Sequence, residues 1–450
     1  MLVMKFGGSS VMDAEHIRHV AKIVRDRLDR KPVVVLSAMG DTTDHLIEAA
    51  EKAISDGPVS VEFSLEKISE THLTALQALG LSTMFTQDLR ELLCDLATLL
   101  SGISLIKEIS PKTRDYLVSF GERLSVRLVA RYFQSLGMNA RPLDAWDAGF
   151  ISDSNFTFAE LVPESWRYIP AALLPLLDSG VLPVVTGFIA KDACGAVTTL
   201  GRGGSDLSAT MIAAACKAEE AQVWKDVDGI LTADPRIVAD ARPVGAVTYE
   251  EAAELAFFGA QVLHPRAMYP CSKTGTPVLV KNSHNLEAPG SVIGSSLPAD
   301  AHHVRAITAR GNITLVDIVS SRMLGQYGFL AEVFSCFARH RISIDMLATS
   351  EVSVSLTVDS TQDIGAAVNE LARIAAVEVK MNKAIVTIIG LVSHSSVILE
   401  SAFGVCARLG VQAQMVSHGA SKVNIGFIVD GSEADTVVRG LHKKFFGEQS

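Results

Sequence analysis

The sequence lacks the long uncharged apolar segments that membrane-spanning helices need. A span takes about 18 apolar residues, and no such run occurs in the 450 residues. The first residues, MLVMKFGGSS, contain no basic region followed by an apolar stretch, so they do not resemble a signal peptide. We therefore expect no association with a membrane.

Cysteine is also scarce, and the six residues are spread over the whole chain: Cys94, Cys194, Cys216, Cys271, Cys336 and Cys406. No CxxC pair occurs among them, although paired cysteines are the usual mark of zinc sites and redox motifs. The spread instead favours single buried thiols in a reducing compartment. We therefore expect a cytoplasmic protein with no metal site of its own.

The chain is moderately acidic, with 40 Lys and Arg against 50 Asp and Glu and a formal net charge of -10. An acidic surface repels the phosphate backbone, so this balance disfavours nucleic acid as a partner. Hydrophobic residues make up 48% and charged residues 20% of the chain, which is typical of folded proteins. The length corresponds to about three domains.

Short apolar segments alternate with helical periodicity through the first two thirds of the chain. The predicted buried strands are residues 2–6, 33–36, 181–185, 222–224 and 277–280. Strands that alternate with helices predict an α/β fold whose mainly parallel sheet is covered by helices on both faces. Residues 62–107 are Leu-rich with helical spacing, and we predict that they form a helical insertion.

The last third of the chain contains an internal repeat, which follows a linker with Gly and Pro at residues 288–298. The segment FSCFAR at residues 334–339 is echoed by FGVCAR at residues 403–408. Each copy has the order strand, helix, strand, strand, helix, and the first adds a last strand near residues 377–380, which is the order of a small ferredoxin-like α+β unit, βαββαβ. We therefore predict one large domain at residues 1–296 and two small ones at 304–382 and 383–447.

Glycine-rich turns stand at predicted strand-to-helix junctions: KFGGSS at residues 5–10, Gly187, and GRGGSD at residues 201–206. Glycine lets backbone N–H groups approach an anion, and the following helix points the positive end of its dipole at the same place. Two such turns can hold two anions. A single turn is weak evidence, however, and neither the Walker loop GxxxxGK[ST] nor GxGxxG occurs.

Charged residues stand beside these turns. Lys5 lies at the end of a very hydrophobic strand, where a lysine that faces a phosphate is the sharper interpretation. Arg202 can bind a carboxylate, Asp206 can organise a metal or donor amides, and Glu122 can accept an ammonium group. Taken singly, each is better explained as a surface ion or a helix cap.

The segment WKDVDGILTADPR at residues 224–236 follows another predicted strand and carries three Asp, one Lys and one Arg. Lys and Arg pair with phosphate oxygens and carboxylates suit Mg²⁺, so the segment suits a nucleotide and its metal. Alternatively, its Asp-Gly and Asp-Pro steps form an ordinary solvated hairpin. No Ser-His-Asp order or HExxH run supports a hydrolase.

Taken together, these segments resemble the aspartate kinases, which have the amino acid kinase fold. The match runs in order over essentially the whole chain, and the spaced set is far harder to meet by chance than any one member. The matching segments are KFGGSSV at 5–11, SAMGDTT at 37–43, FGE at 120–122, GF at 187–188, TLGRGGSD at 199–206, DVDG at 226–229, TADPR at 232–236 and FGAQVLHP at 258–265.

The resemblance implies a three-layer amino acid kinase domain of the carbamate kinase type, followed by two ACT domains. It also implies an aspartate kinase, which uses ATP with Mg²⁺ to phosphorylate the side-chain carboxylate of L-aspartate to 4-phospho-L-aspartate. This reaction opens the biosynthesis of lysine, threonine, methionine and diaminopimelate. Positioning and charge neutralisation dominate in such a transfer, because no side chain need form a covalent intermediate.

Site roles follow from the same resemblance. Lys5 neutralises the transferring phosphoryl group, and Asp206 orients Lys5. Arg202 takes the α-carboxylate of aspartate and Glu122 its α-ammonium group. The other implied contacts are Gly7, Gly8, Ser9, Gly203 and Gly204 for phosphate, Ser37, Thr43, Phe188 and Ser205 for aspartate, and Lys225, Asp226, Leu231, Arg236 and Gln261 for ATP. Some relatives have Tyr where Leu231 stands and Lys where Gln261 stands.

The ACT domains of this family bind an end-product amino acid at a subunit interface. The resemblance therefore implies feedback inhibition by L-lysine and a homodimer or homotetramer, and it makes residues 304–308 a candidate strand of the second ACT unit. The implied effector contacts are Met323, Gly325, Gly328, Phe329, Leu330, Asp345, Ser350 and Glu351. Some relatives carry a His where Gly325 stands.

Two alternatives keep the fold and change the function. The first is a catalytically dead amino acid sensor, and the complete set of Lys5, Glu122, Arg202 and Asp206 argues against it. The second is a kinase for another acceptor, such as glutamate or a nucleotide monophosphate, but those chains usually lack the tandem ACT region.

Overall fold

A computed structural model of the chain describes residues 1–81, 87–258, 263–297, 303–320, 323, 327–390, 395–418 and 423–447, without the side chains of residues 58 and 59. The chain divides into two compact units. The first comprises Met1–Ile230, Gly245–Tyr249 and Leu263–Leu297, and the second comprises Leu231–Val244, Glu250–Val262 and Pro298–Ser450. Two segments that the sequence placed in the large domain therefore pack with the last third of the chain.

The first unit is built on an eight-stranded sheet. In spatial order its strands are β3 (Ala140–Leu143), β5 (Leu182–Thr186), β2 (Pro32–Leu36), β1 (Leu2–Phe6), β8 (Glu220–Lys225), β10 (Val278–Asn282), β11 (Ser291–Gly294) and β9 (Ala246–Thr248). All neighbouring pairs are parallel except β10 and β11. The predicted strands and the mainly parallel sheet are therefore confirmed.

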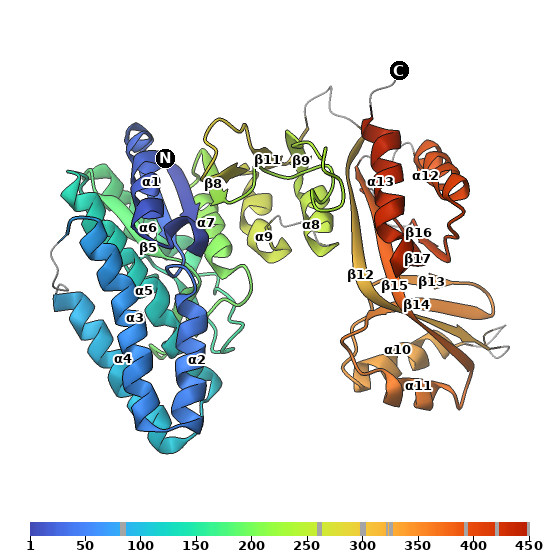
Figure 1. Cartoon of the computed structure of the whole chain (residues 1–450), viewed down its shortest axis with the longest axis horizontal. Helices are drawn as coiled ribbons and strands as arrows, with labels where there is room; N and C mark the ends of the chain where they lie inside the picture. The colour runs from blue at the N-terminus through green and yellow to red at the C-terminus, as the bar shows by residue number, and fades with distance from the viewer. Residues whose placement is uncertain are drawn as a thin grey trace. The chain divides into compact units, whose positions relative to one another are not determined.

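Helices and a small second sheet complete this unit (Figure 1). Its helices are η1 (Gly8–Val11), α1 (Ala14–Arg25), η2 (Leu28–Arg30), α2 (Thr42–Ser55), α3 (Pro58–Ala78), α4 (Gln87–Ile106), α5 (Pro111–Ser135), α6 (Ser165–Asp178), α7 (Gly204–Ala215) and α9 (Pro265–Thr274). The second sheet consists of β4 (Ile151–Ser152), β6 (Ile189–Asp192) and β7 (Val197–Thr199). Helices α3 and α4 occupy the Leu-rich segment that was predicted to be helical, and both pack against α2.

The alternation of side chains along β1 directs Lys5 toward the site. Leu2, Met4 and Phe6 join the hydrophobic cluster that α1 and α5 cover, so Lys5 points to the opposite face. Helix α7 packs against β1 and lies on that face, because Asp206 of α7 contacts Lys5. A strand buried on both sides thus presents one cation to the start of a helix.

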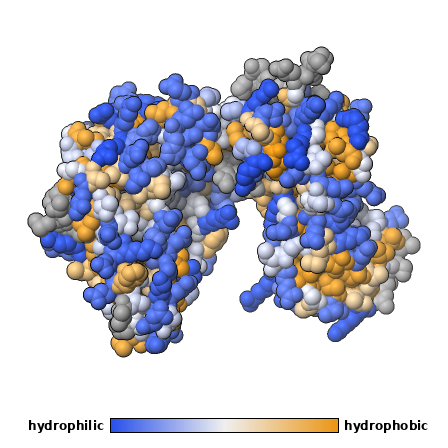
Figure 2. Space-filling view, in the orientation of Figure 1, coloured by the Kyte–Doolittle hydropathy of each residue, from blue (hydrophilic) through white to orange (hydrophobic). Residues whose placement is uncertain are grey.

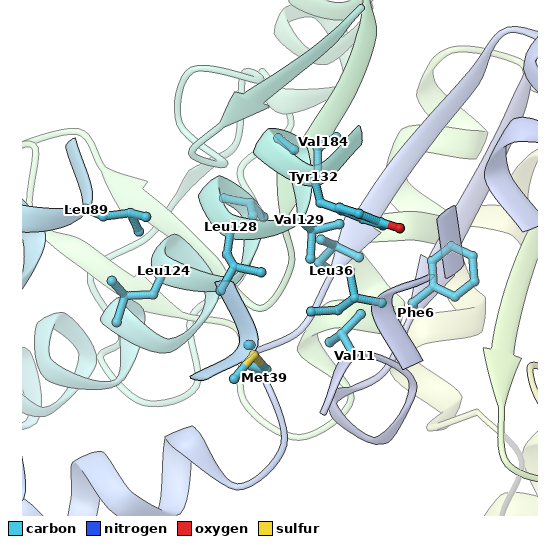
Figure 3. Close-up of a cluster of buried hydrophobic side chains, with 14 of the residues drawn as sticks. Phe6, Val11, Leu36, Met39, Leu89, Leu124, Leu128, Val129, Tyr132 and Val184 are labelled. Atoms are coloured by element: carbon cyan, nitrogen blue, oxygen red, sulfur yellow. The ribbon is translucent and has the colours of Figure 1, made fainter. Parts of the chain in front are cut away.

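Helix α5 contributes several side chains to the cluster beneath the sheet, as Figure 3 shows. Leu124, Leu128 and Tyr132 recur every four residues on this helix, which places them on one face. They lie with Leu36 of β2 and Val184 of β5 in the same buried cluster. This packing fixes α5, and with it Glu122, relative to the ends of the strands.

The second unit contains a six-stranded antiparallel sheet with helices on one face. Its strands, in spatial order, are β13 (Leu347–Thr349), β14 (Ser353–Asp359), β12 (Val304–Val319), β15 (Ala376–Gly390), β17 (Asn424–Asp430) and β16 (Met415–Ser417). The helices are α10 (Phe329–Arg339), α11 (Gly365–Leu371), α12 (Ser395–Leu409), η5 (Gly431–Glu433) and α13 (Ala434–Phe446). Helix α8 (Tyr249–Phe257) begins in the first unit and continues in the second.

Two long strands are shared by both repeats. The Ile313–Val319 part of β12 pairs with β14, whereas its Val304–Arg310 part pairs with the Ile385–Gly390 part of β15, which in turn pairs with β17. The helices divide accordingly, because α10 and α11 cover one hydrophobic cluster and α12 and α13 cover another. The predicted pair of ferredoxin-like units is confirmed, as one continuous sheet.

Candidate active site

The centre of the candidate site is a buried ion pair. The Nζ atom of Lys5 lies 2.7 Å from Oδ1 of Asp206, and the two side chains are 10% and 12% exposed. Burial alone would raise the pKa of Asp206, but the charges of Lys5 and Lys225 and the bond from Lys5 hold this pKa below its ordinary value. Asp206 is therefore ionised, and it holds the Lys5 ammonium group in one position.

The glycines after β1 allow the backbone of the next turn, at Ala38 and Gly40, to approach closely. A Cβ atom on Gly8 would lie 3.0 Å from the carbonyl oxygens of both Ala38 and Gly40, and one on Gly7 would lie 3.5 Å from Nζ of Lys5. The N–H of Gly40 also donates to the carbonyl of Gly8 over 3.2 Å. The turns after β1 and β2 therefore pack closely together. Ser9, the third predicted phosphate contact in this turn, is exposed.

The first turn of α7 also requires glycine. Gly203 has φ +73°, and a Cβ atom there would lie 2.7 Å from Cβ of His264. On Gly204 it would lie 2.7 Å from Cδ2 of Phe188. Helix α7 therefore begins in close contact with its neighbours, and its positive end is directed at the space beside Lys5 and Asp206.

One cavity of about 680 Å³ gathers most of the residues predicted to act on phosphate and aspartate. Those that line it are Lys5, Ser37, Thr43, Glu122, Phe188, Arg202, Gly203, Gly204, Ser205 and Asp206. They come from five separate parts of the first unit. The volume lies in the range of ordinary small-molecule sites.

Glu122 is a buried acidic side chain, and only one of its two oxygens accepts a hydrogen bond within the described part of the chain. Its Oε1 accepts the N–H of Ala38 over 3.2 Å, whereas Oε2 is buried and has no hydrogen-bond partner within the described part of the chain. Burial raises the pKa of Glu122 to about 8, against the weaker opposing effects of the Ala38 bond and the Lys5 charge. A cationic group beside Oε2 would satisfy this oxygen.

Two further predicted residues border the same cavity. Arg202 is exposed, which suits a side chain that meets a ligand entering from solvent. Phe188 has φ +68°, an unusual value for a side chain of this size. Its backbone is held by the bond from its N–H to Oγ of Ser208, 3.1 Å, and by the bond from Leu200 N–H to its carbonyl, 2.8 Å.

Asp115 is the main cavity residue that the sequence did not reveal. It is buried and accepts bonds from the N–H of Thr157 and from the N–H and hydroxyl of Thr199, at 2.8, 2.9 and 2.8 Å. Asp115 stands seven residues before Glu122 on α5, which is about two helical turns, so the two side chains lie on the same face of the helix. The other unpredicted lining residues are Ile47, Arg114, Val118, Thr157, Thr199 and Gly201.

The predicted ATP residues are divided between the units. Lys225 lies at the end of β8, and burial lowers its pKa; Asp226 beside it is exposed. Leu231 and Arg236 belong to the second unit. Arg236 is 80% exposed and pairs with Asp234, with 2.6 Å between Nη2 and Oδ2. Gln261 lies outside the described residues.

The predicted effector residues belong to the second unit. Gly328, with φ +92°, precedes α10, which begins at the buried Phe329, while Leu330, Ser350 and Glu351 are exposed. Asp345 lies 3.4 Å from Nη1 of Arg310. Burial raises the pKa of Asp345 against the opposing charge of Arg310. Met323 is partly buried, and Gly325 lies outside the described residues.

The described part of the second unit contains a group of side chains of the types that bind metal ions. Ligand atoms of Cys336, His340 and Glu370 lie within 4.8 Å of one another in the described part of the second unit. The sequence did not reveal this group, because Glu370 is distant in sequence and packs beside α10 through α11. Within the group, Nε2 of His340 lies 2.9 Å from Oε2 of Glu370, and Arg339 also pairs with Glu370.

The described helices include none that is long and apolar enough to span a membrane.

Comparison with known proteins agrees with this architecture. Residues 1–282 match the amino acid kinase family, and residues 316–373 and 386–445 match the ACT domain. Aspartokinase 1 of Arabidopsis thaliana, a chloroplastic protein, is 47% identical over 99% of this chain and 80% of its own length. Lysine-sensitive aspartokinase 3 of Escherichia coli is 34% identical over 99% of both chains.

Solved structures give the same result. Aspartokinase III of Escherichia coli in complex with aspartate and ADP has a TM-score of 0.82 at 34% identity, over 99% of this chain and 100% of that chain. The complex of the same protein with lysine and aspartate has a TM-score of 0.81. Fold and site thus define an amino acid kinase with ACT domains. Within that class, the chain belongs to the aspartokinase family, and the predicted aspartate kinase activity is confirmed at the level of the family.

Proposed function

We propose that this chain transfers the γ-phosphoryl group of ATP to the side-chain carboxylate of L-aspartate, in the cavity lined by Lys5, Glu122, Arg202 and Asp206. The products are 4-phospho-L-aspartate and ADP, and the reaction is the first step toward lysine, threonine, methionine and diaminopimelate. One observation carries the proposal: the same cavity holds a buried ammonium group fixed by Asp206 and a buried carboxyl group, one oxygen of which has no hydrogen-bond partner among the described residues.

The amino acid acceptor would bind through its two charged ends. Glu122 would receive the α-ammonium group at Oε2, and Arg202 would receive the α-carboxylate as a two-pronged donor. Ser37, Thr43, Phe188 and Ser205 would line the space between them. This arrangement leaves the side-chain carboxylate of aspartate free to approach Lys5.

The transfer itself needs charge neutralisation more than covalent chemistry. A carboxylate must attack a phosphoryl group that carries negative charge, and Lys5 would stabilise the charge that develops on the transferred oxygens. Gly7, Gly8, Ser9, Gly203 and Gly204 would surround the phosphates, with the positive end of α7 behind them. Mg²⁺ would enter bound to the ATP phosphates and neutralise a further part of their charge.

The nucleotide would extend along residues 225–236, with Gln261 at the end of its site. Lys225 would pair with phosphate oxygens, because it lies close enough to Lys5 and Asp206 for their charges to act on it. Asp226, Leu231 and Arg236 would complete the ATP contacts. The exposed Arg236 would exchange its Asp234 partner for phosphate.

The reaction is tested by hydroxamate formation. Purified protein with ATP, Mg²⁺, aspartate and hydroxylamine should give aspartyl hydroxamate, whereas glutamate in place of aspartate should give little. The matched control is Lys5→Ala, which removes the cation from the cavity. Activity of the unaltered protein no higher than that of Lys5→Ala would contradict the proposal, and preferential use of glutamate would reassign the acceptor.

We also propose that L-lysine inhibits the enzyme through the ACT units. The enzyme would act as a homodimer or homotetramer in the cytoplasm. The Escherichia coli relative is named for its lysine sensitivity. Hydrophobic side chains gather on the surface over α10 and α11 (Figure 2), and Leu347 and Val416 on the outer strands β13 and β16 are 39% and 38% exposed. Outer strands that carry apolar side chains favour association between copies.

A further inference from the structure

We infer that the second ACT unit positions the ATP segment of the kinase, through a buried hydrogen bond between Thr232 and His442. This rests on the proposed role of residues 225–236 in nucleotide binding. We call residues 231–243 the nucleotide loop. It begins five residues after Asp226 along the chain, yet it packs within the second unit.

Both the side chain and the backbone of Thr232 are bonded to residues of the ACT sheet and its last helix. The Thr232 hydroxyl lies 2.9 Å from Nε2 of His442 on α13. The carbonyl of Thr232 accepts the N–H of Ile307 on β12 over 2.8 Å. Thr232 and His442 are only 6% and 3% exposed, so water competes little for these bonds.

The same residue closes the loop on itself. The N–H of Thr232 donates to the carbonyl of Arg242, and the N–H of Arg242 donates to the hydroxyl of Thr232, both over 2.9 Å. Leu231 and Pro243 form an isolated bridge beside them. The base of the loop is therefore fixed around Thr232. The exposed Arg236 lies in the part of the loop between the two sides of this base.

Apolar contacts fasten the loop to the same helix. Ala233 and Val238 are buried in the cluster that contains Val438 and Leu441 of α13. The loop also lies along β12 beyond the stretch that β14 pairs with, since β14 ends its pairing at Ile313. Apolar side chains of the loop alone would be enough to cover this edge of β12.

The hydrogen bonds of Thr232 also fix the position of the loop on β12 and α13. Hydrogen bonds constrain distance and angle, whereas apolar packing alone permits sliding. Thr232 joins the hairpin base to β12 and α13 at one point, so a displacement of these elements displaces the loop. His442 is thus a positioning residue: it acts on ATP through Thr232 and does not itself touch the nucleotide.

The test is the affinity for nucleotide, measured by calorimetric titration with MgATP and separately with aspartate. Loss of a neutral hydrogen bond costs about 0.5–1.5 kcal/mol. We therefore expect His442→Ala to weaken MgATP binding about three- to tenfold and to change aspartate binding less than twofold. His442→Gln keeps a polar amide group near the position of Nε2 and should restore most of the affinity. The matched control is Lys443→Ala, one residue further on the exposed face of α13.

Thr232→Val removes the bond to His442 and also the acceptor of the Arg242 N–H, so it should weaken MgATP binding at least as much as His442→Ala. The double variant should bind MgATP no more weakly than Thr232→Val, because that variant already lacks the bond to His442. Unchanged MgATP affinity in both single variants, or equal weakening for MgATP and aspartate, would overturn the inference. Hydroxamate formation by the unaltered protein is read separately: its absence with normal MgATP binding would overturn the proposed reaction and leave this inference standing.

Discussion

At the scale of single residues, the site depends on charges that are buried and still paired. An isolated buried charge is costly, whereas a pair in good geometry keeps both members ionised. Lys5 and Asp206 form such a pair. Glu122 has no such partner in the described chain, and burial keeps its carboxyl protonated at neutral pH. The cavity thus contains a cation ready for phosphate and an acid that becomes a carboxylate when an ammonium group arrives.

Asp206→Asn tests the orienting role of Asp206. The amide keeps the shape of the side chain but removes the negative charge, so Lys5 is no longer held in place. Removal of one preorganised electrostatic contact typically lowers kcat by about 10²–10³, and we expect a loss of this size with little change in KM for aspartate. Steady-state kinetics measure it, with the exposed Asp178→Asn as control. A kcat within twofold of the unaltered enzyme would contradict the assignment.

The raised pKa of Glu122 predicts a pH dependence. Only the carboxylate pairs with an ammonium group, and the pKa of the free cavity is about 8; below that pH, aspartate binding must release a proton. The value of kcat/KM for aspartate should therefore rise by up to about tenfold per pH unit toward this pKa and level off above it.

Glu122→Gln provides the comparison. Gln cannot ionise, so this rise should disappear, and KM for aspartate should increase at least about tenfold through loss of a charged contact. Profiles of kcat/KM between about pH 6 and 9 measure both effects. If the variant keeps the same rise with pH, another group titrates and the role of Glu122 is wrong.

At the scale of elements, helix α5 links the core to the site. One face packs in the hydrophobic cluster, and Asp115, Val118 and Glu122 of the same helix line the cavity. Gly121 lets α5 approach the turn after β2, because a Cβ atom there would lie 2.8 Å from Cβ of Ala38. Ala38 is also the residue whose N–H bonds to Glu122.

Two helical glycines should therefore respond in opposite directions to the same substitution. Gly121→Ala overpacks a tight contact and should destabilise the fold by about 1–3 kcal/mol, with a higher KM for aspartate. A Cβ atom on Gly102 of α4 would meet nothing within 4 Å among the described residues, so Gly102→Ala should stabilise the fold by about 0.5–1 kcal/mol. Denaturant unfolding measures both, and equal effects of the two substitutions would refute the packing argument.

At the scale of the whole molecule, the two units contain different parts of the protein. The first holds the cavity and the second holds the continuous ACT sheet, to which the nucleotide loop is attached. The segment that contains most of α8 also joins the second unit, where the carbonyl of Phe258 accepts a bond from the Thr308 hydroxyl over 2.6 Å. The sequence assigned both segments to the kinase domain, yet their buried side chains complete the regulatory unit.

Lysine at millimolar concentration should inhibit the enzyme, and Asp345→Asn should relieve this inhibition. Asp345 already carries a carboxylate close to Arg310, and an effector ammonium group would gain a charged hydrogen bond to it. Loss of such a bond costs about 1.5–3 kcal/mol, so the half-inhibiting lysine concentration should rise about 10- to 100-fold. Asp359→Asn is the control, because Asp359 also pairs with Arg310. Equal relief in both variants would contradict direct contact of Asp345 with lysine.

Much of the site could be read from the sequence because its parts are local. The glycine-rich turns follow predicted strands, and Lys5 ends a strand that has no other charged residue. Asp115 could not be singled out in this way, because its partners Thr157 and Thr199 come from distant segments. Arg236 pairs with its neighbour Asp234 in the structure, and its contact with phosphate stays a prediction.

The sequence by itself determined the classes of element, the parallel sheet, the repeated ACT units and ten of the residues that line the cavity. These depend on periodicity and on short motifs, which are properties of neighbouring residues. Only the tertiary structure decided which unit holds the nucleotide loop. That choice depends on the Thr232 and His442 bond, which joins residues 210 positions apart, and on burial of Ala233 and Val238 against α13. Contacts of this kind leave no local pattern in the sequence, because each partner alone is an ordinary threonine, histidine or apolar residue.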